Sequence, residues 1–392
     1  MNKSTKIKPL RLAGLILAGL AALMVVALGY VKISAGSGRA YPDLSTEALH
    51  GPMDLERVAA LPLPPGNVAV SSSGRVFFNY HYLGSDGDEA GNSVFELVDG
   101  EPRPFPDATF QQNFRSTLGM LIDRQNRLWI IDPATIDGSR DTALFAFDAD
   151  NGELLHEYHF SEDWDFAQDI QLSPDGRYLI SADTGLFGFI PARLLVLDID
   201  TGEYRVALKG HPSVGVQNWG IRGPDGKKIS VFWGLIDWQA GVDGIAVSPD
   251  GAWLYYGSIN HSTLFRLPFD LLIDPETPEE ELRQAVEPLG EKPLSDGLSI
   301  DNRGNIYITD IENGGIARMS PEGNLETLVK DSRVRWADGI SFGPDSWLYF
   351  TDSAISVYLT ETGDPPDPSV HEEHGPYGIY RFRNDTPGFP GS

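Results

Sequence analysis

The sequence predicts an all-β fold, a six-bladed β-propeller preceded by one apolar N-terminal helix. The main observation is an internal repeat, because one pattern recurs six times: a short alternating strand, a polar turn, and a second strand rich in aromatic and β-branched residues. Equivalent positions fall at residues 66, 118, 168, 243, 296 and 338, so the spacings are 52, 50, 75, 53 and 42 residues. Four-stranded propeller blades recur at this kind of period.

The second observation is a further hairpin between several of these copies. Its turns stand at Asp150-Asn151-Gly152, Asp200-Thr201-Gly202 and Glu322-Gly323-Asn324. Asn and Gly tolerate the positive φ that tight hairpin turns require. Two hairpins per repeat give four strands, so residues 56–392 are expected to form one propeller. A strand over residues 378–382 is expected to pair near Val58 and close the ring.

Two stretches interrupt the repeat. Residues 206–241 lengthen one interval and contain Trp219, Trp233 and Trp238, which predicts an insertion on one face or a long loop over the channel mouth. In the other stretch, residues 274–286, Thr277-Pro278-Glu279-Glu280 has the form of a capping box with Pro at the first helical position. One short helix is expected there.

The first 55 residues predict a membrane segment. Residues 1–11 are basic, residues 12–31 carry no charge and are long enough to cross a bilayer as a helix, and residues 32–55 are expected to be a linker. Positive charge before the apolar run predicts that the start stays in the cytoplasm and the body is extracytoplasmic, at the periplasmic face of the inner membrane. The alternative is a signal sequence cleaved near Gly38-Arg39-Ala40, which would give a secreted protein.

Charge and cysteine content exclude several functions. The 392 residues contain 30 Lys+Arg and 56 Asp+Glu, a net charge of −26. Residues 1–40 hold six cations and no acid, so the remainder has a net charge of −32. A nucleic-acid partner is excluded because such binding needs clustered cations. The chain has no cysteine, which excludes disulfides and thiolate metal sites.

The repeated acids are the main candidate site. Equivalent positions in a ring of blades point to a common axis, so Asp243, Asp296 and Asp338 are expected to converge near one channel mouth. Carboxylates brought together need a cation, and with Asn67 they suit a hard divalent ion, most simply calcium. The alternative is structural, because an Asp before Gly often caps its own turn.

Other residues are assigned by their position in the pattern. Asp132, Asp310 and Asp352 end second strands and are expected to be structural. His81, Asn260 and His261 follow second strands, where loops line a pocket, and Trp219 lies in the insertion; these four are the candidate substrate-binding residues.

The motifs resemble known propeller families. Segments 243–249 (DGIAVSP), 254–256 (LYY), 263–268 (TLFRLP) and 127–132 (RLWIID) resemble the major royal jelly/yellow protein family. Ser295-Asp296-Gly297 and Ala337-Asp338-Gly339 resemble the wider senescence-marker-protein and gluconolactonase propellers.

The resemblance implies site roles. In the calcium-dependent lactonases of that group, metal ligands precede the innermost strands and one carboxylate is also the general base. Asp243 and Asp296 then take the positions of ligands, with Asp296 as the base, while Gln168 and Asp169 stand where a polar residue contacts substrate or metal. The first blade departs from the pattern, because a Glu ligand is expected there and Gly66-Asn67 is found.

Three functions follow as hypotheses. The first is an extracytoplasmic propeller hydrolase of lactonase type with a divalent cation at the channel mouth. The second is a yellow-like isomerase of an oxidised catechol-type ring. The third is a non-catalytic propeller that binds a small ligand. Fold alone does not choose among them.

Overall fold

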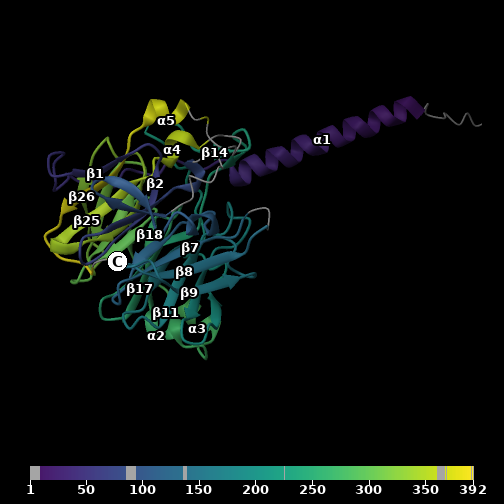
Figure 1. The fold of residues 1–392 in the computed structure, drawn as a ribbon. Helices are drawn as coiled ribbons and strands as arrows, with labels where there is room; N and C mark the ends of the chain where they lie inside the picture. Colours follow the sequence, from purple (N-terminus) through teal and green to yellow (C-terminus); the bar gives the residue numbers. More distant parts are fainter. Residues whose placement is uncertain are drawn as a thin grey trace, which may run out of the picture.

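The computed structural model describes residues 9–84, 94–135, 139–224, 226–359, 367, 369–389 and 391. Residues 1–8, most of the predicted basic start, lie outside the described residues. The described chain forms six four-stranded antiparallel sheets around one axis, which confirms the predicted six-bladed propeller (Figure 1).

The blades follow the chain in order. The first is β2 (Pro65–Val70), β3 (Val76–Tyr80), β4 (Val94–Val98) and β5 (Glu101–Pro104). The second is β6 (Met120–Ile122), β7 (Arg127–Asp132), β8 (Thr142–Asp148) and β9 (Leu154–Phe160). The third is β10 (Ala167–Leu172), β11 (Tyr178–Asp183), β12 (Arg193–Asp198) and β13 (Tyr204–Ala207). The fourth is β16 (Val242–Val247), β17 (Trp253–Ser258), β18 (Thr263–Pro268) and β19 (Glu287–Glu291). The fifth is β20 (Leu298–Ile300), β21 (Ile306–Asp310), β22 (Gly315–Met319) and β23 (Leu325–Lys330).

The sixth blade closes the ring. It combines β24 (Ala337–Phe342), β25 (Trp347–Asp352) and β26 (Tyr377–Arg383) with β1 (Glu56–Leu61), in the order β1-β26-β25-β24. Because β1 comes from the start of the propeller and β26 from its end, their pairing joins the two ends of the chain. The strand predicted over residues 378–382 and its pairing near Val58 are therefore confirmed.

The six repeat positions mark the first strand of each blade, and first strands of neighbouring blades contact one another around the axis. Glycine permits this approach. A Cβ on Gly244 would clash with the backbone of Asp296, and one on Gly297 with the backbone of Asp338. Likewise, a Cβ on Gly339 would clash with the backbone of Asn67. The Gly of each Asp-Gly pair is thus required by the narrow centre of the ring.

Second-strand acids have the structural role that the sequence predicts. Asp352 accepts hydrogen bonds from the backbone N–H groups of Arg335 (2.8 Å) and Trp336 (3.0 Å) and pairs with the Arg335 guanidinium at 2.6 Å. Asp132 accepts backbone N–H groups of Arg115 (2.8 Å) and Ser116 (2.6 Å). These carboxylates fix the connection that leads into the next first strand.

The insertion over residues 206–241 is confirmed as an irregular segment with its own short hairpin, β14 (Ser230–Val231) and β15 (Ile236–Asp237). It enters β16, so it lies on the face where the first strands begin, which we call the mouth face. The expected short helix is α3 (Glu279–Ala285), with Pro278 as its N-cap rather than its first residue. Three helices were not predicted: α2 (Phe269–Ile273), α4 (Ile355–Tyr358) and α5 (Ser369–His374). Three short 3-10 turns, η1 (Tyr82–Gly84), η2 (Phe110–Asn113) and η3 (Pro344–Ser346), complete the described elements.

The N-terminal helix α1 runs from Pro9 to Ala35, longer at both ends than the predicted residues 12–31. Its C-terminal extension arises because no helix breaker occurs before Gly36, and the Ser34 hydroxyl bonds back to the Tyr30 carbonyl at 2.8 Å. Residues 17–35 are long and apolar enough to cross a membrane, a property that signal sequences share. Figure 1 shows α1 projecting from the propeller beside β14.

The predicted linker is hydrogen-bonded to the propeller. The backbone N–H groups of Leu49 and His50 donate to the carbonyls of Thr327 (3.1 Å) and Leu328 (2.9 Å) on β23. The Tyr41 hydroxyl donates to the Lys292 carbonyl at 2.9 Å. The segment between α1 and β1 is therefore packed along the propeller, because the outer strand β23 offers unpaired backbone groups.

Candidate active site in the propeller channel

Backbone irregularities hold the candidate residues in place. The pairing between first and second strands shifts register between Val242 and Ile245, and between Ala337 and Ile340. The same shift occurs between Ala167 and Ile170 and between Pro65 and Val68. Each shift is a β-bulge that leaves two residues without a ladder partner. Bulges re-aim side chains, and these four hold the following pairs at the axis: Asp243-Gly244, Asp338-Gly339, Gln168-Asp169 and Gly66-Asn67.

The structure brings the predicted metal-binding residues together. Asn67, Asp243, Asp296 and Asp338 all line two adjoining cavities in the channel. The upper cavity lies on the side of the mouth face. The inner cavity lies further down the channel and is also lined by Asp169. The convergence expected from the repeat is thus present, and none of the three Asp side chains serves as a simple turn cap.

Burial dominates the electrostatics of this acid cluster, which consists of Asp169, Asp243, Asp296 and Asp338. Burial raises the pKa of Asp243 well above its usual value, and repulsion from Asp296, Asp169 and Asp338 raises it further. Burial likewise raises the pKa of Asp338, with Asp296 adding to the effect. Burial raises the pKa of Asp169 to about 7, although backbone N–H groups oppose the shift. Like charges held together and buried in the channel favour the protonated forms.

Asp296 is the acid most readily ionised among the strongly shifted members. Burial raises its pKa to about 6, while hydrogen bonds from Trp336 and Asp243 and the charge of Lys292 hold it down. The Trp336 indole Nε1 donates to Asp296 Oδ2 at 2.6 Å. A carboxyl with a pKa near neutrality is suited to general base catalysis. Trp336 was missed from the sequence, because a buried tryptophan near a strand usually signals packing alone.

Lys292 supplies the positive charge behind the cluster. Its side chain is fully buried, and Nζ donates to Ser295 Oγ (2.8 Å), the Ser258 carbonyl (2.9 Å) and the Pro293 carbonyl (3.1 Å). Burial lowers its pKa to about 7, while the negative charges of Asp310 and Asp296 oppose this shift. The ammonium has three acceptors, so its role is to position the Ser295-Asp296 segment. Within the acid cluster, Asp296 is the member whose charge acts on Lys292.

The donor set fits a hard cation. Asp243 Oδ2 is buried and has no hydrogen-bond partner, which is costly for a carboxylate unless a cation or proton joins it. Carboxylate and amide oxygens, as in Asn67, are the ligands that calcium prefers. The chemistry of these donor atoms therefore fits a cation. Among the residues that the structure describes, however, no three His, Asp or Glu side chains are arranged as a formed metal-binding group.

The upper cavity has a largely apolar wall. Leu83 follows β3, Ile259 follows β17, Ile355 begins α4, and Trp238 comes from the insertion. Predicted contacts His81 and Gln168 also line this cavity. Burial lowers the pKa of His81 to about 3, so its imidazole is neutral at physiological pH. None of the described residues that line the upper cavity is Lys or Arg.

Three predicted substrate contacts lie elsewhere. Asn260 is buried and structural, because its amide accepts the Ala240 N–H at 2.9 Å and donates to the Trp219 carbonyl at 3.0 Å. His261 accepts the Thr263 N–H at 3.0 Å and packs on Phe265. The Trp219 ring packs edge-on against Tyr41, with centroids 4.9 Å apart. None of the three is among the described residues that line either cavity, since each fastens the insertion or its neighbouring loop.

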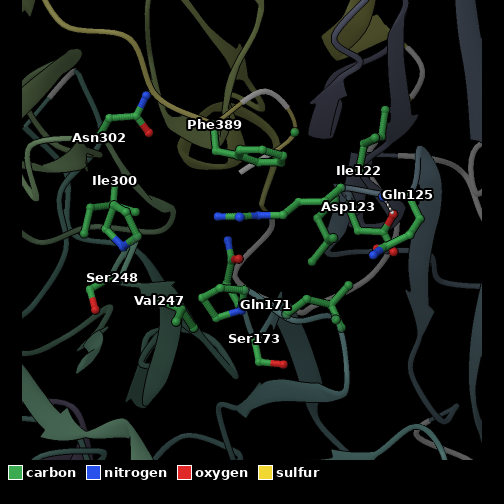
Figure 2. Close-up of a pocket in the computed structure, with 17 residues that line it drawn as sticks. Ile122, Asp123, Gln125, Gln171, Ser173, Val247, Ser248, Ile300, Asn302 and Phe389 are labelled. Carbon is green, nitrogen blue, oxygen red and sulfur yellow. Dashed lines mark hydrogen bonds between the residues drawn. The ribbon is translucent and has the colours of Figure 1, made fainter. Parts of the chain in front are cut away.

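The C-terminal segment packs across the opposite end of the channel, beside a pocket that shares Leu121, Gln171 and Gly391 with the inner cavity. The Gly391 N–H donates to the Phe342 carbonyl at 2.8 Å, and the Gly391 carbonyl accepts the Ile122 N–H at 3.2 Å. Phe389 lies over the Arg124 guanidinium, 4.7 Å from its ring centroid. Figure 2 shows the pocket at this end of the channel, with Phe389 across from Gln171 and Val247. On the mouth face, the side chains around the upper cavity are themselves largely buried, among them His81, Ile259 and Ile355.

Comparisons with known proteins point to one group. Residues 234–354, which include Asp243, Asp296 and Asp338, match the family model of the SMP-30/gluconolactonase/LRE-like region. The findings support a gluconolactonase-like propeller. They do not show the major royal jelly/yellow family. A curated relative, the 6-deoxy-6-sulfogluconolactonase of Pseudomonas putida, is 30% identical over 126 residues, which are 32% of this chain. The chain spans about two fifths (42%) of the length of that relative.

Solved structures share the fold. A gluconolactonase from Xanthomonas campestris has 14% sequence identity and a TM-score of 0.53, over 89% of this chain and 98% of that one. The calcium-binding protein regucalcin from Agrobacterium tumefaciens has 15% identity and a TM-score of 0.50, over 85% of this chain and 94% of that one. At these identities the likeness concerns the propeller fold.

Proposed function

We propose that this chain is a lactone hydrolase whose general base is Asp296. The observation that carries the proposal is the acid cluster, buried at the channel axis, facing a small cavity on the mouth face and lying largely within the segment that matches the gluconolactonase-like region. The name of the curated relative, a lactonase acting on a sulfonated sugar lactone, supports the reaction class.

The residues of the chain account for the proton transfers. A lactone enters the upper cavity with its ring between Trp238 and the acid cluster, where Gln168 and Asn67 offer hydrogen bonds. The Asp296 carboxylate takes a proton from water as the water oxygen bonds to the carbonyl carbon. The ring C–O bond then breaks, and the same proton passes to the leaving alkoxide. The product is a hydroxy acid.

A divalent cation, most simply calcium, completes the proposal. Asp243, Asp296, Asp338 and Asn67 would hold it. When bound, such an ion polarises an ester carbonyl and favours ionisation of water. The calcium binding stated for the regucalcin of the same fold supports this choice. We further propose that α1 anchors the propeller in a membrane, with the body on the extracytoplasmic side.

The test is hydrolysis of a lactone panel by the purified full-length chain, followed as acid release at constant pH. Turnover that EDTA abolishes and calcium restores is expected. If a panel of sugar, aryl and alkyl lactones gives no turnover with calcium, magnesium, manganese or zinc, the hydrolase proposal is wrong. Saturable binding of a panel member without turnover would favour a binding propeller instead.

Trp336→Phe is expected to change the pH dependence of catalysis. The variant loses the indole hydrogen bond that lowers the pKa of Asp296. The acidic limb of kcat/KM against pH should therefore move to higher pH, and the rate on that limb should fall by about 10-fold, as for loss of a hydrogen bond to a charged group. Trp347→Phe, outside the site and stacked under Arg381, is the matched control. An unmoved limb with an equal loss at all pH values would show a packing effect only.

Neutral lactones with alkyl substituents are expected to be better substrates than charged ones. The upper cavity presents apolar walls, four acids below them, and no lining Lys or Arg among the described residues. Placing an anion there costs several kcal/mol, so kcat/KM for an alkyl lactone should exceed that for a ring-matched carboxylated or sulfonated lactone at least ~10-fold. Competition between the two in one assay measures the ratio. A preference for the charged lactone would contradict this substrate class.

A further inference from the structure

Exposed aromatic side chains gather on two loops beside α1. Trp233 is 79% exposed and Phe232 is 46% exposed at the tip of the β14–β15 hairpin. On the neighbouring loop between β11 and β12, Phe189 is 59% exposed and Ile190 is 38% exposed. We call these four residues the aromatic tip. Large apolar side chains grouped and exposed in this way mark an interaction surface.

The backbone is built to present this tip. Phe232 and Trp233 have φ values of 52° and 55°, and Gly234 follows at 74°. Aromatic residues rarely adopt the left-handed region, which costs free energy that the surrounding structure must offset. In the neighbouring loop Phe187 is also left-handed, at 47°, and its ring contacts Phe232 edge-on at 6.5 Å. Two strained turns therefore support each other while their tips point away from the propeller core.

The end of α1 is fastened to the same hairpin. Ala35 packs in one apolar cluster with Val231 and Ile236. The Lys32 ammonium donates to the Gly234 carbonyl at 2.6 Å, and the Lys228 ammonium donates to the Gly36 carbonyl at 3.0 Å. The helix is therefore held at a fixed position next to the turn that carries Trp233.

This attachment sets the depth of the tip. The uncharged run of α1 ends immediately before Lys32, and Lys32 is the residue that contacts the Trp233–Gly234 turn. If α1 spans a bilayer, Lys32 lies at its surface, where tryptophan and cationic side chains are enriched. The aromatic tip then lies at the same level. Lys228 also contacts the end of α1, and its ammonium pairs with Asp237 at 2.6 Å.

We propose that the aromatic tip is a membrane-contact surface that enters the headgroup region of the bilayer crossed by α1. This inference rests on the anchor of the proposed function. Trp238 connects the proposed membrane contact with the candidate site, because this residue packs against the cluster that holds the end of α1 and also lines the upper cavity. The mouth face is thereby held over the bilayer, so that an apolar lactone dissolved in lipid reaches the acid cluster directly.

Single-cysteine labelling tests this surface, because the chain contains no cysteine. Full-length protein with Trp233→Cys or Phe189→Cys, labelled with an environment-sensitive fluorophore, is reconstituted in phosphatidylcholine–phosphatidylglycerol vesicles. Spin-labelled lipids then quench the fluorophore if it lies within the interface, about 5–10 Å into the headgroup and acyl boundary. Leu23→Cys in α1 reports the anchor, and Thr201→Cys, on an exposed turn between β12 and β13, reports the opposite face.

Strong quenching at positions 23, 189 and 233 with none at 201 is the expected result. Adding Trp233→Asp should then reduce quenching of the label at position 189 while leaving that at position 23 unchanged. Quenching at 23 alone would overturn the contact surface, whether the tip faces water or another protein. Absence of quenching at 23 would overturn both the anchor and the contact surface. Lactone turnover of the same preparations tests the hydrolase separately.

Discussion

Replacing Asp296 by asparagine is expected to lower kcat for lactone hydrolysis by about 10²–10⁴-fold, the usual contribution of a general base. Asparagine keeps the shape of the side chain and can still accept the Trp336 indole hydrogen bond. It cannot take a proton from water, so the loss should fall on kcat while KM changes little. Initial rates of the purified full-length variant over the pH range of the wild type measure both constants.

Asp310→Asn is the matched control for this variant. Asp310 is also a buried acid with a raised pKa, caused by burial, but it lies at the end of β21 and accepts hydrogen bonds from the Asn313 backbone and side chain, at 3.1 Å each. An asparagine there keeps an acceptor for these donors, so activity close to that of the wild type is expected. If Asp296→Asn retains activity within about 10-fold of the wild type, below the usual effect of a base, Asp296 is not the base. Asp169 would then be the next candidate.

The fold was predictable because its determinants are local and repeated. Alternating strands, glycine-containing hairpin turns and the Asp-Gly positions each recur with the blades. The ring closure between β1 and β26 was also accessible, since one unpaired strand stood at each end. What the repeat could not predict was the contact of Thr46, Leu49 and His50 with β23 and the docking of α1, because both depend on contacts between segments without a pattern.

Only those site residues that occupy a repeated position in the blades were predictable. Asp243, Asp296 and Asp338 share one position in the blade, so the ring brings them together independently of the conformation of the loops. His81 and Asn260 both follow second strands, yet only His81 lines the cavity. Side chains of an irregular loop have no periodicity from which their direction follows. Trp336 was missed because its partner Asp296 lies 40 residues away in the sequence. Lys292 was missed because two of its three acceptors are backbone carbonyl groups, which any residue type can supply.

Calcium is expected to stabilise the protein against thermal unfolding. The acid cluster is buried, and one Asp243 oxygen has no hydrogen-bond partner. A bound divalent cation would neutralise this cluster in the folded state only. At a calcium concentration 100 times the dissociation constant, the free energy of unfolding should rise by about 2.7 kcal/mol. Differential scanning calorimetry of the full-length protein with calcium or with EDTA measures the change as a shift in Tm.

Metal-free protein should lose stability as pH rises from about 5 to about 7, the range of the raised carboxyl pKa values. The pKa values of Asp296 and Asp169 in the folded protein are about 6 and about 7, above the value of about 3.9 for an unfolded Asp. The folded state therefore binds more protons, and its stabilisation is lost as pH rises through these values. Lys292 has the opposite effect, because its pKa is lowered to about 7 in the folded protein. Above about pH 7 the unfolded state binds more protons at this lysine, so its contribution to stability rises with pH.

The calcium effect should therefore be small at about pH 5 and large at about pH 7, since calcium binds the ionised carboxylates that the metal-free fold tolerates poorly. Asp243→Asn is expected to abolish most of the calcium-dependent Tm shift and also to raise the metal-free Tm at about pH 7, because it removes one buried acid. Asp310→Asn should leave the calcium shift intact. Equal Tm values with calcium and EDTA at both pH values would show that the acid cluster holds protons rather than a metal, and a mechanism without a cation would then be required.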